Sequence, residues 1–135
     1  MWLSLLNTKE TLKFLDLAIY MVSIDGQVTD AQKNLLGRIM REVGFVVSDY
    51  SFEKSDSIED TIDFFVNANQ VVKNVVFLNL VKISLVDDLY NTTEHAFLVE
   101  VQKKLNISQA RRRELMGIAY EERDLREKAS RVLKN

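Results

Sequence analysis

Apolar side chains recur every three or four residues along most of the chain, the spacing that places them on one face of an α-helix. This pattern predicts a first helix that starts near Thr8 and ends near Ile24, and a second that starts after Thr29 and ends at Gly44. The apolar faces of these two helices consist of Leu12, Leu15, Ile19 and Val22, and of Leu35, Leu36, Ile39, Met40 and Val43.

The segment from Gln70 to Val86 is the most apolar part of the chain and has almost no polar face. Its many β-branched residues, Val71 and Val75 among them, would suit a strand. Its length of about 17 residues favours a buried helix, because strands seldom exceed about ten residues.

Three further helices are expected around this segment. Ser57 is a good N-cap for a short helix that runs through Ala68, and a longer helix is expected from Thr92 to Leu105. Ser108 caps a last helix that reaches Leu133. Residues 45–57 show no clean periodicity and are expected to form a connection.

The last predicted helix has an interrupted apolar stripe. Its members are Leu115, Ile118, Leu125, Ala129 and Val132. Because Glu122 falls within this stripe, the far end of the helix is expected to project or bend. Gly37 and Gly117 lie in helix interiors, where glycine costs about 1 kcal/mol relative to alanine. Both glycines therefore predict a close approach of two helices.

Composition supports a single all-α domain of about six helices over residues 1–135. The chain is 47% hydrophobic and 28% charged, which argues against disorder. It has no proline and only four glycines, whereas sheets joined by tight turns usually need more of both. The absence of cysteine excludes disulfides, zinc–thiolate sites and thiol nucleophiles. A net charge of −2 does not indicate a polyanionic partner.

The apolar pattern repeats at an offset of 62 residues. Ala18, Ile19 and Met21 correspond to Leu80, Val81 and Ile83, and the later positions Leu35, Leu36 and Ile39 correspond to Phe97, Leu98 and Val101. The helix starts correspond as well, because Thr29 with Gln32 matches Asn91 with Glu94. Each pair resembles a capping box, in which the N-cap and a Glu or Gln three residues later satisfy each other's backbone N–H. We therefore expect two pseudo-repeated hairpins of the form helix–acidic turn–helix.

The turn of each hairpin is acidic: Asp25 and Asp30 in the first, Asp87 and Asp88 in the second. A carboxylate at a helix C-terminus is unfavourable by about 0.3–1 kcal/mol, so these residues need an explanation. One explanation is turn chemistry, since aspartate accepts hydrogen bonds from nearby backbone N–H groups. The other is a site for Ca²⁺ or Mg²⁺, which prefer carboxylate oxygens. The ligand spacing of an EF-hand is absent.

The stretch "AIYMVSIDGQVTDAQKNLLGRIMREVGF" resembles the tellurite-resistance TerB-like helical domain family, which is also similar to the N-terminal region of a DnaJ-type membrane-anchored co-chaperone. The family pattern is an apolar helix, Ala-Asp-Gly, a hydroxyl N-cap, Glu three residues on, and Leu-Gly at the helix end. Here Asp25-Gly26, Thr29, Gln32 and Val43-Gly44 occupy those places, and "LVDDLYNTTEHAFLVEVQKKLNIS" resembles a second copy.

The resemblance implies an all-helical, bacterial, cytoplasmic protein connected with stress response or tellurite resistance. It also implies a candidate divalent-metal site at Asp25, Asp87, Asp88 and Glu94. Two positions depart from the pattern, because Gln32 replaces the family's Glu and Asp88 replaces its second Gly.

No catalytic residues and no organic cofactor are predicted. His95, the single histidine, is expected at the surface, and no phosphate-binding or nucleophile motif is present. Arg111–Arg113 is expected to be a solvated face, or to pair with the acidic segment 49–63, rather than to bind nucleic acid, because acidic residues follow it closely. Met1–Leu6 is too short for a signal peptide or a membrane span, and is expected to fold back over the core or to contact a partner.

The sequence therefore favours a non-catalytic protein-interaction module, with another protein as its partner and no nucleic acid or membrane span. The alternative is a divalent-cation (Ca²⁺ or Mg²⁺) binding or sensing domain that uses the acidic turns. Both hypotheses leave the oligomeric state open.

Overall fold

The structure, a computed structural model, describes residues 2–24, 26, 28–44, 57–86 and 91–135 of the chain. These residues form one all-helical domain, and none of them lies in a strand. The elements are η1 (Leu3–Leu5, a 3-10 helix), α1 (Thr8–Ser23), α2 (Asp30–Glu42), α3 (Ile58–Phe64), α4 (Gln70–Ser84), α5 (Thr92–Lys104) and α6 (Gln109–Lys134).

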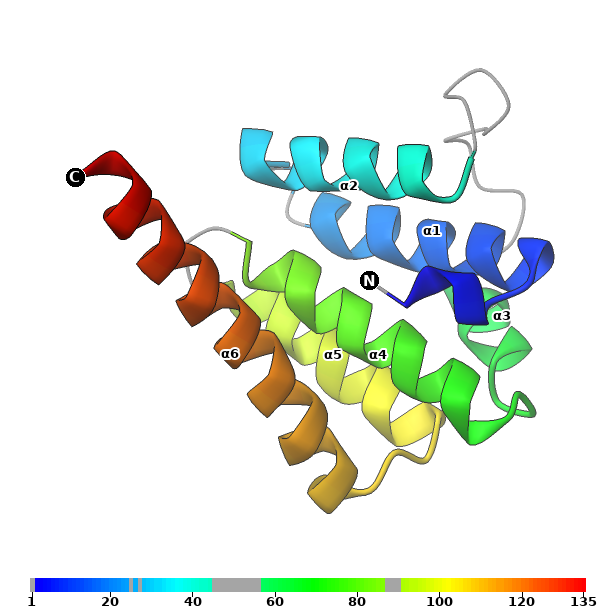
Figure 1. Ribbon diagram of the computed structural model, residues 1–135. Coiled ribbons are helices and arrows are strands. Elements are labelled where there is room, and N and C mark those ends of the chain that lie inside the picture. The colour runs from blue at the N-terminus through cyan, green and yellow to red at the C-terminus, as the bar shows by residue number, and fades with distance from the viewer. Residues whose placement is uncertain (1, 25, 27, 45–56, 87–90) are drawn as a thin grey trace.

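The helices are arranged as two antiparallel pairs and a long final helix (Figure 1). The α1–α2 pair lies against the α4–α5 pair, and α6 crosses the other side of α4. The central helix α4 contacts η1, α1, α2, α5 and α6. Between the pairs, the rings of Tyr20 on α1 and Phe97 on α5 pack in a tilted arrangement with a centroid distance of 5.1 Å.

The segment from Gln70 is a buried helix and not a strand, as its length predicts. It ends at Ser84, two residues earlier than expected. Its buried apolar residues are Val72, Val75, Val76, Phe77, Leu78, Leu80, Val81 and Ile83. The fully buried Asn79 donates from Nδ2 to the Val75 carbonyl, which compensates for part of its desolvation. Among the described residues, no helix combines the length and apolar character needed to cross a membrane.

Side-chain caps start the helices where the sequence predicts, with one shift. The N-caps of α2, α3, α5 and α6 are Thr29, Ser57, Asn91 and Ser108, as expected. In α1 the cap is Asn7 rather than Thr8, because Asn7 and Glu10 form the reciprocal capping box at 2.8 Å in each direction. Gly44 ends α2 with a positive φ of 78°, which confirms its role as terminator.

The last helix is attached to the body only by its first half. Leu115 and Ala119 are buried, and Glu122 forms a 2.6 Å ion pair with Lys82 of α4. This pair explains the acid within the apolar stripe. The prediction that the helix projects beyond Glu122 is confirmed, because Leu125 and Val132 are exposed. The far end of α6 projects past the other helices (Figure 1).

Neither interior glycine marks a close helix approach, so that prediction is also wrong. A Cβ atom added at Gly117 would meet nothing within 4 Å, and one at Gly37 would meet only the Arg41 side chain at 3.6 Å. We expect Gly117→Ala to raise the free energy of unfolding by about 0.5–1 kcal/mol, because alanine removes conformational freedom from the unfolded chain. Urea denaturation followed by circular dichroism measures the change.

Gly44→Ala is the matched control for this substitution. A side chain there is strained by the positive φ of 78°, so a loss of stability is expected instead. A Gly117→Ala protein that is less stable than the wild type would mean that α6 is not a regular helix at this point.

Candidate functional site

Only one member of the predicted metal set lies in the described part of the chain. Asp25, Asp87 and Asp88 fall outside the described residues, and Glu94 lies in the first turn of α5. Within the described ranges, no group of three or more His, Cys, Asp or Glu side chains is placed to hold a metal ion. The four-residue metal site therefore stays a prediction.

Glu94 instead takes part in a buried contact with Gln32. The two side chains are 3% and 2% exposed. Gln32 Nε2 donates to Glu94 Oε2 at 3.0 Å, and Asn91 Nδ2 approaches the same oxygen at 3.5 Å. Gln32 also completes the α2 capping box, since its Oε1 accepts from the Thr29 backbone N–H at 3.2 Å. The Gln32 side chain thus caps the start of α2 and also forms a hydrogen bond to α5.

The place of this contact explains how a carboxylate is tolerated in the interior. Both residues sit three positions after an N-cap, so the first turns of α2 and α5 meet there. The N-terminus of a helix carries partial positive charge and free N–H groups, which favour a nearby carboxylate. The amide of Gln32 adds a direct donor. A cation bound at Glu94 Oε2 would first have to displace this amide.

The Gln32–Glu94 contact joins two residues that correspond under the 62-residue offset. Burial follows the same offset, since Ile39 and Val101 are both fully buried and Met40 and Gln102 are nearly so. These observations fit a local two-fold relation between the hairpins. The superposition of the hairpins themselves stays a prediction.

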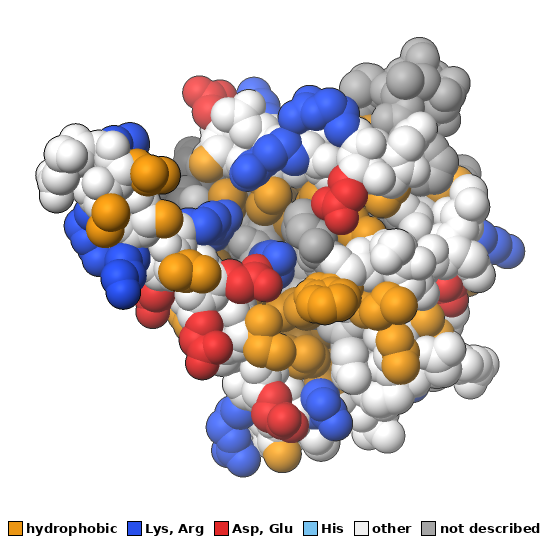
Figure 2. Space-filling view, in the orientation of Figure 1, with side chains coloured by type: hydrophobic (Ala, Val, Ile, Leu, Met, Phe, Trp, Pro, Cys, Tyr) orange, Lys and Arg blue, Asp and Glu red, His pale blue; other side chains and the backbone are white. Residues whose placement is uncertain are grey.

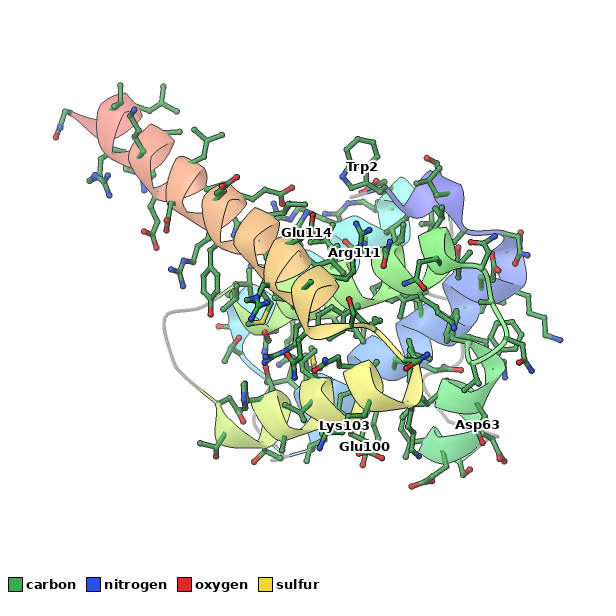
Figure 3. All side chains as sticks on the ribbon, turned by 90° about the horizontal axis from the view of Figure 1, so that it is seen from below. Trp2, Asp63, Glu100, Lys103, Arg111 and Glu114 are labelled. Carbon is green, nitrogen blue, oxygen red and sulfur yellow. The ribbon has the colours of Figure 1, made fainter. Side chains whose placement is uncertain are left out.

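The other polar residues that the sequence singles out do not converge on this contact. His95, next to Glu94, is half-buried rather than solvated. Arg111 lies 3.9 Å from Glu114 on its own helix (Figure 3). The acidic segment 49–63, the predicted partner of Arg111–Arg113, lies mostly outside the described residues, so that pairing stays a prediction.

A second candidate site is an exposed apolar surface formed by Trp2, Leu5 and Val71, here called the η1 surface. Leu3 and Leu6 are buried, so the start of the chain does fold onto the core. The indole of Trp2 remains 62% exposed and stands away from the helices (Figure 3). Trp2 also adopts a left-handed backbone conformation, with a φ of 63°.

Val71 is the member of the η1 surface that the sequence does not reveal. The strongly apolar Gln70–Val86 segment predicts that it is buried, but it lies in the first turn of α4 beside η1 and is about half exposed. Figure 2 shows an apolar surface over this part of the molecule. Ser4 of η1 and Gln70 and Asn74 of α4 are polar and uncharged, and Glu42 of α2 lies beside Ser4.

In comparisons with known proteins, no family model, no curated protein and no solved structure matches this chain. The TerB-like resemblance therefore rests on the motifs around Asp25-Gly26 and Thr29–Gln32 alone.

Proposed function

We propose that this protein is a non-catalytic protein-interaction module of the TerB-like kind, which acts in the cytoplasm of a bacterium in a stress-response or defence system. The observation that carries the proposal is the exposed Trp2 on an anchored segment. Tryptophan is the residue type most enriched at the energetic centres of protein interfaces. A strained backbone conformation and an exposed indole both lower the stability of the folded protein, and such features are found most often at functional sites.

The anchoring of η1 supports an interaction role in a second way. Leu3 and Leu6 are buried on either side of Leu5, so Leu5 and its neighbour Trp2 are held in place before any partner arrives. A preorganised surface loses less conformational entropy on binding than a mobile tail does.

Replacing Trp2 tests this proposal. We expect Trp2→Ala to weaken binding of the partner by about tenfold or more, the usual effect of truncating a central interface aromatic. The partner is first isolated with the wild-type protein from the native cell and identified by mass spectrometry. It is then purified, and its dissociation constant is measured by isothermal titration calorimetry with each variant.

Val66→Ala is the matched control, because Val66 is exposed but lies in the connection that follows α3. It is expected to bind the partner as the wild type does. Equal affinity of the wild type and Trp2→Ala for every purified partner would overturn the η1 surface as the binding site. Unchanged thermal unfolding of Trp2→Ala excludes a loss of folding as the cause.

A further inference from the structure

The far half of α6 carries a second exposed apolar surface, separate from the η1 surface. From Asp124 onward every residue of the helix is exposed except the half-buried Ser130. Leu125 and Val132 are each 66% exposed, and Ile118 is also exposed at the point where the helix leaves the body. These three residues are spaced by seven positions, so they lie on one face, with Ala129 between the last two.

Charged residues flank this apolar face in a self-complementary pattern. Glu121 and Lys128 are seven positions apart and lie on the same side of the face, and both are exposed. Arg126 lies on the opposite side. In paired helices, charges in such flanking positions determine the partner and its orientation. Figure 2 shows that apolar and charged side chains alternate over this end of the molecule.

We propose that the exposed face of α6 from Ile118 to Val132 packs against the same face of α6 in a second copy of this chain, with the two helices antiparallel. A two-fold axis then places Glu121 of each copy opposite Lys128 of the other, so two Glu–Lys ion pairs form across the contact. Ile118, Leu125, Ala129 and Val132 fill the seam between the helices.

The size of the contact sets its strength. Protein interfaces that bury less than about 1,200 Å² in total are usually weak and transient. Two helices that contact each other over about two heptads bury less than this area. We therefore expect a reversible dimer that forms at high micromolar to millimolar protein. This self-association uses neither Trp2 nor Val71, so Trp2→Ala leaves it unchanged.

Analytical ultracentrifugation of the full chain over a concentration series tests the proposal. The wild type is expected to move from monomer to dimer as its concentration rises. Leu125→Glu is expected to weaken the dimer at least tenfold, because it places a carboxylate in the apolar seam. Glu127→Lys is the control: residue 127 is two positions on, about 200° around the helix, so it faces away from the seam and the dimer is expected to persist.

Charge reversal distinguishes the antiparallel pairing from other contacts. Glu121→Lys and Lys128→Glu are each expected to weaken the dimer several-fold, and the double variant is expected to restore it. In a parallel pair Glu121 would instead face Arg126 of the other copy, so the double variant would stay weak. A wild type that remains monomeric at millimolar concentration, or a double variant that does not recover, would overturn the proposal.

Discussion

Gln32→Glu is expected to lower the free energy of unfolding by about 3 kcal/mol at neutral pH. The substitution keeps the size of the side chain but replaces the amide that donates to Glu94 Oε2 at 3.0 Å with a second carboxylate. Two buried like charges at this distance repel each other strongly. An acid in the first turn of α2 gains about 0.3–1 kcal/mol from the helix dipole, which is too little to compensate.

The loss in Gln32→Glu is expected to depend on pH in a defined direction. The folded variant holds one proton between the two carboxyl groups at a pH where the unfolded chain has released it. Because the folded state then binds more protons, stability falls as the pH rises and recovers as the pH is lowered toward about 5. Urea denaturation at several pH values, with the wild type in parallel, measures this difference.

The double variant Gln32→Glu/Glu94→Gln is the matched control. It restores one amide and one carboxylate with their places exchanged, so most of the lost stability is expected to return. A single variant as stable as the wild type at neutral pH would contradict the facing arrangement of the two side chains. Urea denaturation also tests metal binding at Glu94. Because the Gln32 amide already occupies Glu94 Oε2, the wild type is expected to be equally stable in Ca²⁺ and in a chelator.

Phe77→Ala is expected to lower the free energy of unfolding by about 3–5 kcal/mol, because it leaves a cavity at the centre of the domain. Phe77 is fully buried on α4, the helix that contacts η1 and four other helices. A loss of this size is a large part of the roughly 5–15 kcal/mol that stabilises a typical domain. Urea denaturation followed by circular dichroism measures the loss as a lower midpoint.

Two variants make the Phe77 result interpretable. Phe77→Leu keeps most of the volume and is expected to cost about 1–1.5 kcal/mol, so it reports on the site even if Phe77→Ala does not fold. Val71→Ala, on the same helix but half exposed, is expected to change stability by less than about 0.5 kcal/mol. Equal losses in Phe77→Leu and Val71→Ala would contradict the central position of α4.

Local patterns in the sequence were sufficient to predict the helices. The caps at Thr29, Ser57, Asn91 and Ser108 and the terminator Gly44 were all predicted, because each acts through hydrogen bonds or backbone angles within a few residues. The helical state of the Gln70 segment followed from its length. The one shifted start, Asn7 for Thr8, is a choice between adjacent capping residues.

The candidate sites were only partly predictable. Gln32 and Glu94 were each visible as capping residues, but their shared burial and direct contact depend on how the first turns of α2 and α5 meet. The sequence placed Val71 in the core, where the structure leaves it half exposed, but the position of Glu122 did predict that the far end of α6 projects. Leu125 and Val132, the large residues of the α6 stripe beyond Glu122, are exposed because the far end of α6 projects past the other described helices (Figure 1).

The sequence by itself determined that the chain is all-helical and where most of its helices begin, since those properties depend on interactions between near neighbours. Only the tertiary structure decided which apolar residues are covered, since burial depends on elements distant in the chain. That is why Trp2, Val71 and Leu125, which are as apolar as the core, lie at the surface. The same reason applies to Glu94, whose carboxylate is buried against an amide 62 residues away.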